Sequence, residues 1–136
     1  VWLLDKYYQI KTKNMNNQKQ FGVWMDSHNA TVVGSENANE GALTVLAHVK
    51  REATSSNSNE KTSNNHEQTL QAKFFKEITT HMTNATNVHI TGTGQVQEQF
   101  IHHLKATPQF KNSEMDESTS NKMSDEKLIE YITSRI

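Results

Sequence analysis

A short turn with two glycines most constrains what this chain can fold into. Residues 88–91 alternate apolar and polar side chains, and Gly92 and Gly94 follow them at once. The segment that leaves the turn places Phe100 and Leu104 on one face. Alternation with a period of two predicts a strand, and apolar residues three and four apart predict a helix. The stretch is therefore a strand, a tight turn and a helix, which is a building unit of α/β domains.

The Gly-x-Gly pattern alone is a weak motif. Glycine can adopt a positive φ, and it can allow two backbone segments to approach each other closely. The functional interpretation is an anion held by free N–H groups at the start of the following helix. The third glycine and the downstream acidic residue of a dinucleotide site are both missing, so we expect no nicotinamide cofactor. Gly92, Gly94 and Gln95 remain candidate contact residues.

Length and composition indicate one domain with a small core. The chain has 136 residues, of which 33% are hydrophobic, and its mean hydropathy is -0.81. A chain of this size buries about two thirds of its unfolded surface. The net charge of -1 gives no overall basic field that would attract nucleic acid. The lack of cysteine excludes disulfides, zinc–thiolate sites and thiol catalysis.

Two expectations concern location and the N-terminus. No apolar stretch approaches the roughly 20 residues that cross a bilayer, so we expect a cytoplasmic protein without a membrane partner. Met15 precedes a polar lead, which favours residues 15–136 as the domain and residues 1–14 as an N-terminal extension or a cloning remnant. Apolar side chains such as Trp2 and Tyr7 leave open that the extension docks on a groove or a second copy.

Three strands open the domain. Residues 21–26 form an apolar run, 30–34 follow a turn at 27–29, and 43–49 alternate with β-branched residues. These runs predict an antiparallel meander. Residues 53–68 are dominated by Ser, Thr and Asn, which predicts a mobile polar loop. A loop of this length is most often either functional or simply disordered.

The second half alternates helices and strands. From Thr69 the apolar residues recur four apart and predict a helix. The strand at 88–91 and a helix to about Lys105 follow, and Pro108 ends that helix. We expect a fifth, edge strand near 113–117 and a helix capped by Ser124. The predicted order is strand-strand-strand-helix-strand-helix-strand-helix.

Three stretches carry a resemblance to a known family. They are Gly22-Val23-Trp24-Met25-Asp26-Ser27-His28-Asn29-Ala30, Ile90-Thr91-Gly92-Thr93-Gly94 with Phe100 and Leu104 downstream, and Ser124-Asp125-Glu126-Lys127-Leu128. The chain from Phe21 to Ile132 resembles the middle domain of archaeal and eukaryotic class-I peptide release factors and of the ribosome-rescue factor Pelota. It resembles more closely the small stand-alone bacterial proteins called translational machinery protein. The resemblance implies a ribonuclease-H-like three-layer α/β domain with a mixed five-stranded sheet.

One functional feature of the release factors is changed in this chain. Those factors carry a Gly-Gly-Gln tip on the long loop after the third strand, where the glutamine backbone helps water attack peptidyl-tRNA. The resemblance places Gln68 near the glutamine position, but His66 and Glu67 stand where the glycines should be. Glycines at such a tip allow close approach to RNA. We therefore expect no peptidyl-tRNA hydrolysis.

Catalytic alternatives lack a recognisable motif. A ribonuclease-H-like nuclease needs clustered carboxylates for two metal ions. Asp26 at a strand end, with Glu77 and Asp116 or Glu117, is the available set. Asp26 beside His28 could instead set the hairpin through local hydrogen bonds. The seven histidines show no i, i+4 pair on a helix, so we expect them on the surface and expect no metal site.

The sequence thus predicts a translation-related binding protein with no recognised catalytic constellation and no cofactor. Its expected partners are the ribosome, RNA such as tRNA, or a translation factor, and no DNA is expected. The candidate contact residues are Lys50, Arg51, Lys61, His66, Gln68, Gly92, Gly94 and Gln95. A metal-dependent ribonuclease-H-like nuclease and a protein-interaction module outside translation are the two alternatives.

Overall fold

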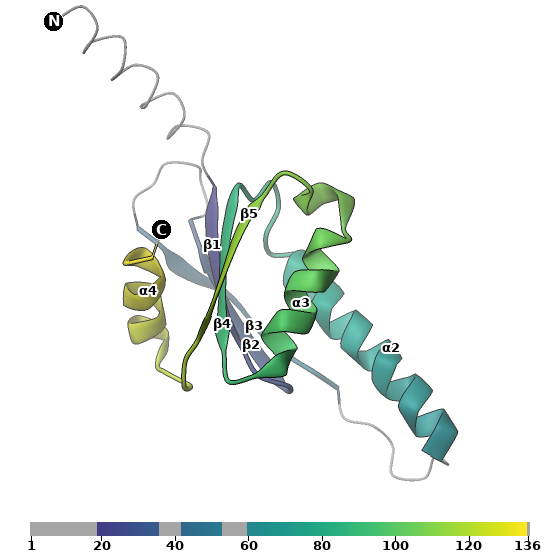
Figure 1. Cartoon of the computed structure of the whole chain (residues 1–136). Helices are drawn as coiled ribbons and strands as arrows, with labels where there is room; N and C mark the ends of the chain where they lie inside the picture. The colour runs from purple at the N-terminus through teal and green to yellow at the C-terminus, as the bar shows by residue number, and fades with distance from the viewer. Residues whose placement is uncertain (1–18, 36–41, 53–59, 136) are drawn as a thin grey trace, which may run out of the picture.

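The domain has three layers, with one sheet between two helical layers (Figure 1). The structure is a computed structural model that describes residues 19–35, 42–52 and 60–135, with only the backbone for residues 60–64. Helices α2 (Glu60–Thr79) and α3 (Gln95–Lys105) cover one face of the sheet. Helix α4 (Asp125–Thr133) covers the other face.

The sheet has five strands in the order β3-β2-β1-β4-β5. The strands are β1 (Gln20–Met25), β2 (Asn29–Gly34), β3 (Thr44–Lys50), β4 (Asn87–Gly92) and β5 (Glu114–Thr119), and a short 3-10 helix, η1 (Pro108–Phe110), precedes β5. β2 is antiparallel to β1 and to β3, whereas β4 is parallel to β1 and to β5. The predicted fold class, a mixed five-stranded α/β domain with helices on both faces, is confirmed, as are the element order and the edge position of β5.

Two cores lie on the opposite faces of the sheet because alternate residues of a strand point to opposite sides. The larger core joins β1, β2 and β4 to α2 and α3, and its side chains include Phe21, Val23, Met25, Val32, Phe74, Phe75, Ile78, Ile90, Phe100 and Leu104. The smaller core lies under α4 and consists of Trp24, Val33, Leu43, Leu128 and Ile132. Phe74, Phe75 and Phe100 are therefore core residues of one face, and Trp24 is a core residue of the other.

Close packing positions α4 on the sheet. A Cβ atom at Gly22 would overlap the side chain of Ile132, so only glycine allows this approach. Ser124 caps the helix, accepting a hydrogen bond from the Lys127 N–H at 3.3 Å. His48 Nε2 lies 3.1 Å from Asp125 Oδ2, which fixes the first turn of α4 to β3. The predicted Ser124 cap is confirmed.

The N-terminal half of α2 differs from the prediction. We expected a polar loop over residues 53–68 and a helix from Thr69, but α2 begins at Glu60. The loop prediction is wrong from Glu60 onward, and residues 53–59 lie outside the described residues. The first turns of α2 carry no apolar residue that periodicity could detect. Helix propagates readily from a packed segment, and Leu70 and Phe74 supply that packing.

Other predictions fall on residues that the structure does not describe. Residues 1–14, interpreted as an extension or a cloning remnant, lie outside the described ranges. Among the described residues, no helix is long and apolar enough to cross a membrane.

The two glycines of the Gly-x-Gly turn have different roles. Neither glycine has a positive φ. A Cβ atom on Gly92 would overlap the Met25 carbonyl oxygen of β1 and would stand 2.7 Å from Gln97 Oε1. Gly94 has an extended φ of 179°, and no atom lies within 4 Å of the position that its Cβ would take. The close approach expected from the sequence is therefore real at Gly92, whereas nothing in the fold requires glycine at position 94.

The substitution Gly92→Ala should lower the free energy of unfolding by about 3 kcal/mol, because overpacking against a backbone atom forces strands apart. Urea denaturation monitored by circular dichroism measures this change. Gly94→Ala is the matched control and should cost no more than about 1 kcal/mol, which is the usual effect of alanine at an N-cap. Equal losses in the two variants would contradict the close approach of β4 to β1.

Candidate RNA- or partner-binding surface

Four strands end at the same edge of the sheet. β4 and β5 run parallel to β1, and β3 has the same direction because both β1 and β3 are antiparallel to β2. The turn at 26–28, residues 50–52 and the turn at 93–94 therefore meet at this edge. The chain leaves β1 toward β2 on one side and β4 toward β5 on the other, so the edge contains a topological switch point, where ligands of open α/β sheets bind.

The hairpin turn after β1 is held by Asp26. Its Oδ1 accepts hydrogen bonds from the N–H groups of His28 at 2.8 Å and Asn29 at 2.7 Å. The exposed His28 ring uses Nδ1 in a 2.7 Å hydrogen bond with the Ser27 hydroxyl. Two interpretations were open for Asp26: a metal ligand, or a residue that sets the hairpin turn together with His28. These contacts agree with the second interpretation.

Arg51 ties three elements together at this edge. Its N–H donates to the His28 carbonyl at 2.8 Å, and Nη1 lies 3.5 Å from the Ser27 carbonyl. Nη2 donates to both the carbonyl and the carboxylate of Glu67 on α2, at 3.0 and 2.5 Å. The Arg51 side chain is only 15% exposed, against 46% for Glu67. Arg51 therefore joins β3 and the first hairpin to α2, and its charge is balanced there.

A hollow of about 370 Å³ opens beside Arg51, which we call the edge hollow. Its lining consists of Ser27, Arg51, Gln71, Thr93, Gly94, Gln95, Val96 and Gln99. The side-chain amide of Gln71 on α2 donates to the side-chain oxygen Oε1 of Gln99 on α3 at 2.6 Å, so the two helices are bridged at the hollow. Most of the lining side chains are polar, and the size lies within the usual range of ligand sites.

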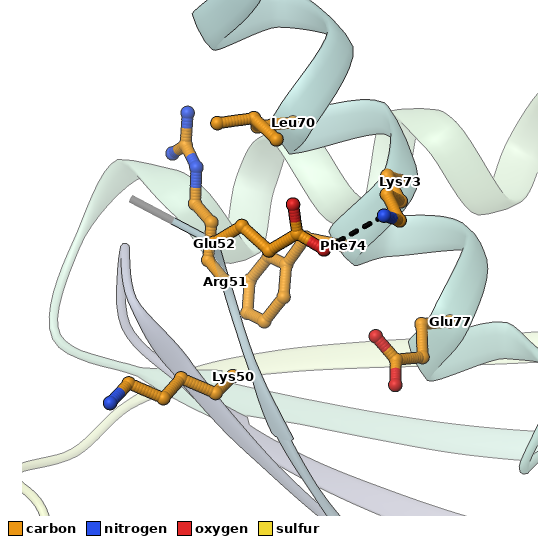
Figure 2. A pocket seen from close by; sticks show the side chains of 7 residues that line it. All are labelled: Lys50, Arg51, Glu52, Leu70, Lys73, Phe74 and Glu77. Carbon is orange, nitrogen blue, oxygen red and sulfur yellow. Dashed lines mark hydrogen bonds and ion pairs between the residues drawn. The ribbon is translucent and has the colours of Figure 1, made fainter. Parts of the chain in front are cut away.

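A second, much smaller cleft lies between the end of β3 and α2 (Figure 2). Lys73 donates to Glu52 at 2.7 Å, and this hydrogen bond lowers the pKa of Glu52 and raises the pKa of Lys73. Lys50 points away from Glu52 and Glu77 (Figure 2). The space inside is about 10 Å³, which is room for about one water molecule. The cleft therefore contains an exposed ion pair, Glu52–Lys73, and is too small for a ligand.

The structure brings together some of the residues that were predicted to contact RNA or a partner. Arg51, Gly94 and Gln95 line the edge hollow, and Gly92 lies just before it at the end of β4. Lys50 is exposed at the end of β3. His66 and Gln68 are exposed on α2, and they are absent from the lining of the hollow. Lys61 lies in α2, where its side chain is outside the description.

Several residues of this surface were missed from the sequence. Ser27, Gln71 and Gln99 line the hollow, and Glu67 balances Arg51. One signal was available, because Gln95 and Gln99 are four residues apart and share one face of a helix. The same spacing relates Glu67 to Gln71. The pairing of these two faces depends on how α2 and α3 pack, which spacing does not specify.

Acidic and histidine residues do not gather into a metal site in the described part of the chain. No group of three or more His, Asp or Glu side chains there could hold a metal ion. Asp26 uses one carboxylate oxygen for the hairpin turn. Asp116 and Glu117 follow each other on β5 and so point to opposite faces of the sheet.

The prediction that the histidines lie on the surface is wrong for His89. Its side chain is buried on β4, where Nε2 lies 2.8 Å from the Ser118 hydroxyl. The Ser118 hydroxyl also contacts Tyr131 of α4 at 2.7 Å and Thr91 at 2.9 Å. Burial lowers the pKa of His89, and the positive charge of Arg135 lowers it further, against an opposing effect of Asp116.

His103 is a second histidine whose environment disfavours its charged form. The ring stacks on Phe100, with centroids 6.3 Å apart, and contacts Phe75. Burial lowers the pKa of His103. Its neighbour His102 is exposed, as expected for adjacent helical residues that point in different directions.

Comparison with known proteins supports the fold. No protein-family profile matches the chain, and no curated protein matches its sequence. The chain is similar in structure to Pelota from Archaeoglobus fulgidus, with a TM-score of 0.60, 10% identity and coverage of 96% of this chain and 35% of that protein. An archaeal translation termination factor gives a TM-score of 0.54, 11% identity and coverage of 89% and 36%.

A third structure extends this likeness. Pelota from Thermoplasma acidophilum matches with a TM-score of 0.54 at 16% identity, over 85% of this chain and 32% of that protein. The chain spans about a third of the length of each of these proteins. At such identities the likeness shows a shared fold, and the structural part of the resemblance to release factors and Pelota is confirmed.

The stability of the domain should fall as the pH drops through the ordinary histidine pKa of about 6.5. His89 and His103 have lowered pKa values in the folded state, so the unfolded chain binds more protons below that pH. Urea denaturation at pH 7.5 and 5.5 should show this loss, and His89→Gln combined with His103→Gln should reduce it. His102→Gln is the matched control and should keep the full dependence. An unchanged dependence in the double variant would contradict the assignment.

Proposed function

We propose that this chain is a translation-related binding domain of the kind found in the middle of class-I release factors and Pelota. The observation that carries the proposal is the fold likeness to two Pelota proteins and a translation termination factor over 85–96% of the chain. Its partners are the ribosome, tRNA or another RNA, or a translation factor. Fold likeness alone does not transfer activity, so the binding surface must be argued from its residues.

The sheet edge with the hollow is the contact surface in this proposal. Arg51, Gly94 and Gln95, which were chosen from the sequence, meet there. Lys50 precedes Arg51 in the chain and is exposed; it does not line the hollow, and it is not part of the Glu52–Lys73 pair. Because the chain has a net charge of -1, an RNA contact must depend on such a local arrangement rather than on an overall field.

Hydrolysis of peptidyl-tRNA is not part of the proposed function. His66, Glu67 and Gln68 lie inside α2 rather than at the tip of a loop. Glu67 is held by Arg51, and the Gln68 backbone belongs to a helix. Both features support the absence of hydrolysis, because helical backbone groups are already hydrogen-bonded and cannot approach a substrate as a glycine-rich tip does.

Sedimentation of a cell lysate through a sucrose gradient tests the proposal. Tagged protein should co-migrate with ribosomal subunits at low salt and should leave them as salt increases, because phosphate contacts release counterions. Lys50→Ala combined with Lys61→Ala should reduce co-migration. The matched control is Lys105→Ala with Lys111→Ala, which removes the same charge near the opposite end of α3 and should keep co-migration. Protein confined to the top of the gradient at every salt concentration would sink the translation proposal.

A release assay tests the absence of hydrolysis. Ribosomes that carry labelled peptidyl-tRNA should release no peptide above background when the purified protein is added, and Gln68→Ala should behave like the unchanged protein. A release factor added to the same ribosomes is the positive control. Release that depends on Gln68 would refute the non-catalytic part of the proposal and would leave the binding part standing.

A further inference from the structure

The edge hollow contains Gly94, the N-cap residue of α3, where no neighbouring atom requires a glycine. Gly92 is required because β1 passes against it, but no atom lies within 4 Å of a Cβ at Gly94 and its φ is extended. Gly94 nevertheless lines the hollow together with Thr93 and Gln95. A glycine outside a special φ is typically needed where a backbone approaches another group closely. Glycine is one of several residues favoured at an N-cap, and here it also leaves the backbone bare, with room for a group that enters the hollow from outside.

The lining indicates the chemistry of that group. Three glutamine amides, Gln71, Gln95 and Gln99, each offer a donor and an acceptor. Arg51 adds a planar guanidinium, but Glu67 balances its charge. An isolated phosphate would be held best by unpaired cations, which this lining lacks, whereas base edges carry mixed donors and acceptors that amides and guanidinium groups recognise.

We propose that the edge hollow receives an unpaired RNA base, which lies against the bare backbone of Gly94 and is hydrogen-bonded by the surrounding amides. The inference rests on the proposed function, and it names the ligand of that same surface. Sequence-specific recognition of RNA commonly uses bases splayed out of single strands into such sites. The volume of about 370 Å³ lies within the range of small-ligand pockets.

The bridge between Gln71 and Gln99 gives the hollow its selectivity in this proposal. The hydrogen bond of 2.6 Å uses one amide hydrogen of the Gln71 side chain and the side-chain oxygen Oε1 of Gln99. The second amide hydrogen of Gln71 and both amide hydrogens of Gln99 are not needed for the bridge. The bridge therefore orients two amides toward one ligand and leaves them further hydrogen-bonding groups. Because the side chains are already ordered, binding costs less conformational entropy.

The decisive variant is one whose new side chain fills the hollow. Gly94→Leu places a side chain in open space, so it should keep the fold while it occludes the hollow, with a modest loss of stability because leucine is a poor N-cap residue. Gln109→Leu is the matched control, because Gln109 is exposed and does not line the hollow. Thermal unfolding of both variants checks the fold. A second variant, Gln95→Ala with Gln99→Ala, keeps the hollow open and removes its amides.

The probes are a fluorescein-labelled single-stranded RNA of mixed sequence and an abasic strand of the same length, compared by fluorescence anisotropy. The unchanged protein and Gln109→Leu should bind the base-bearing strand about tenfold more tightly than the abasic strand. Gly94→Leu and the double glutamine variant should bind both strands equally, at the affinity of the abasic strand.

Two results would overturn the inference. Equal binding of both strands by the unchanged protein would show a contact with phosphate alone, and the proposed function would stand. No binding of either strand would also exclude the base site, and the sedimentation experiment would then decide separately whether the protein joins the ribosome through a protein partner.

Discussion

The parallel pairing of β1 with β4 is the contact on which the rest of the structure depends. These strands form the centre of the sheet, and β4 comes so close to the end of β1 that Gly92 meets the Met25 carbonyl. Strand-end turns can meet at one edge only if the strands share a direction. This pairing therefore places the Asp26 turn beside Gly94. Gln97 completes the contact, because its amide accepts from the Gly94 N–H and donates to the Ser118 carbonyl of β5.

The two faces of the sheet are stabilised by different means. The face under α2 and α3 is apolar, and its core combines aliphatic side chains with five phenylalanines, Phe21, Phe74, Phe75, Phe100 and Phe110. The opposite face combines a small apolar cluster with a polar network, in which Ser118 links His89 and Thr91 of the sheet to Tyr131 of α4. Buried networks of this kind stabilise the fold when their partners are complete and become costly when one of them gains a charge. The position of α4 is therefore coupled to the protonation of His89.

Arg51 shows how a structural contact and a candidate binding surface share the same atoms. Its guanidinium fixes α2 through Glu67 and at the same time forms one wall of the edge hollow. Because the pair is nearly neutral, the surface offers directional hydrogen bonds rather than a strong field. Such a surface favours recognition of a shaped, polar group over attraction at long range, as expected for a chain without net positive charge.

The sequence alone determined the elements whose side chains are periodic. The apolar run of β1, the alternation in β3 and β4, the spacing of Leu70 and Phe74 in α2 and the Ser124 cap were all readable, because local pattern and buried face coincide there. The first turns of α2 were missed, since they are polar on every face and depend on Arg51 and on the packed half of the helix. The edge hollow was decided by tertiary structure, because Arg51, Gln71 and Gln99 lie on three different elements. Only the strand order and the helix packing bring those elements together, and periodicity within one segment carries no information about either.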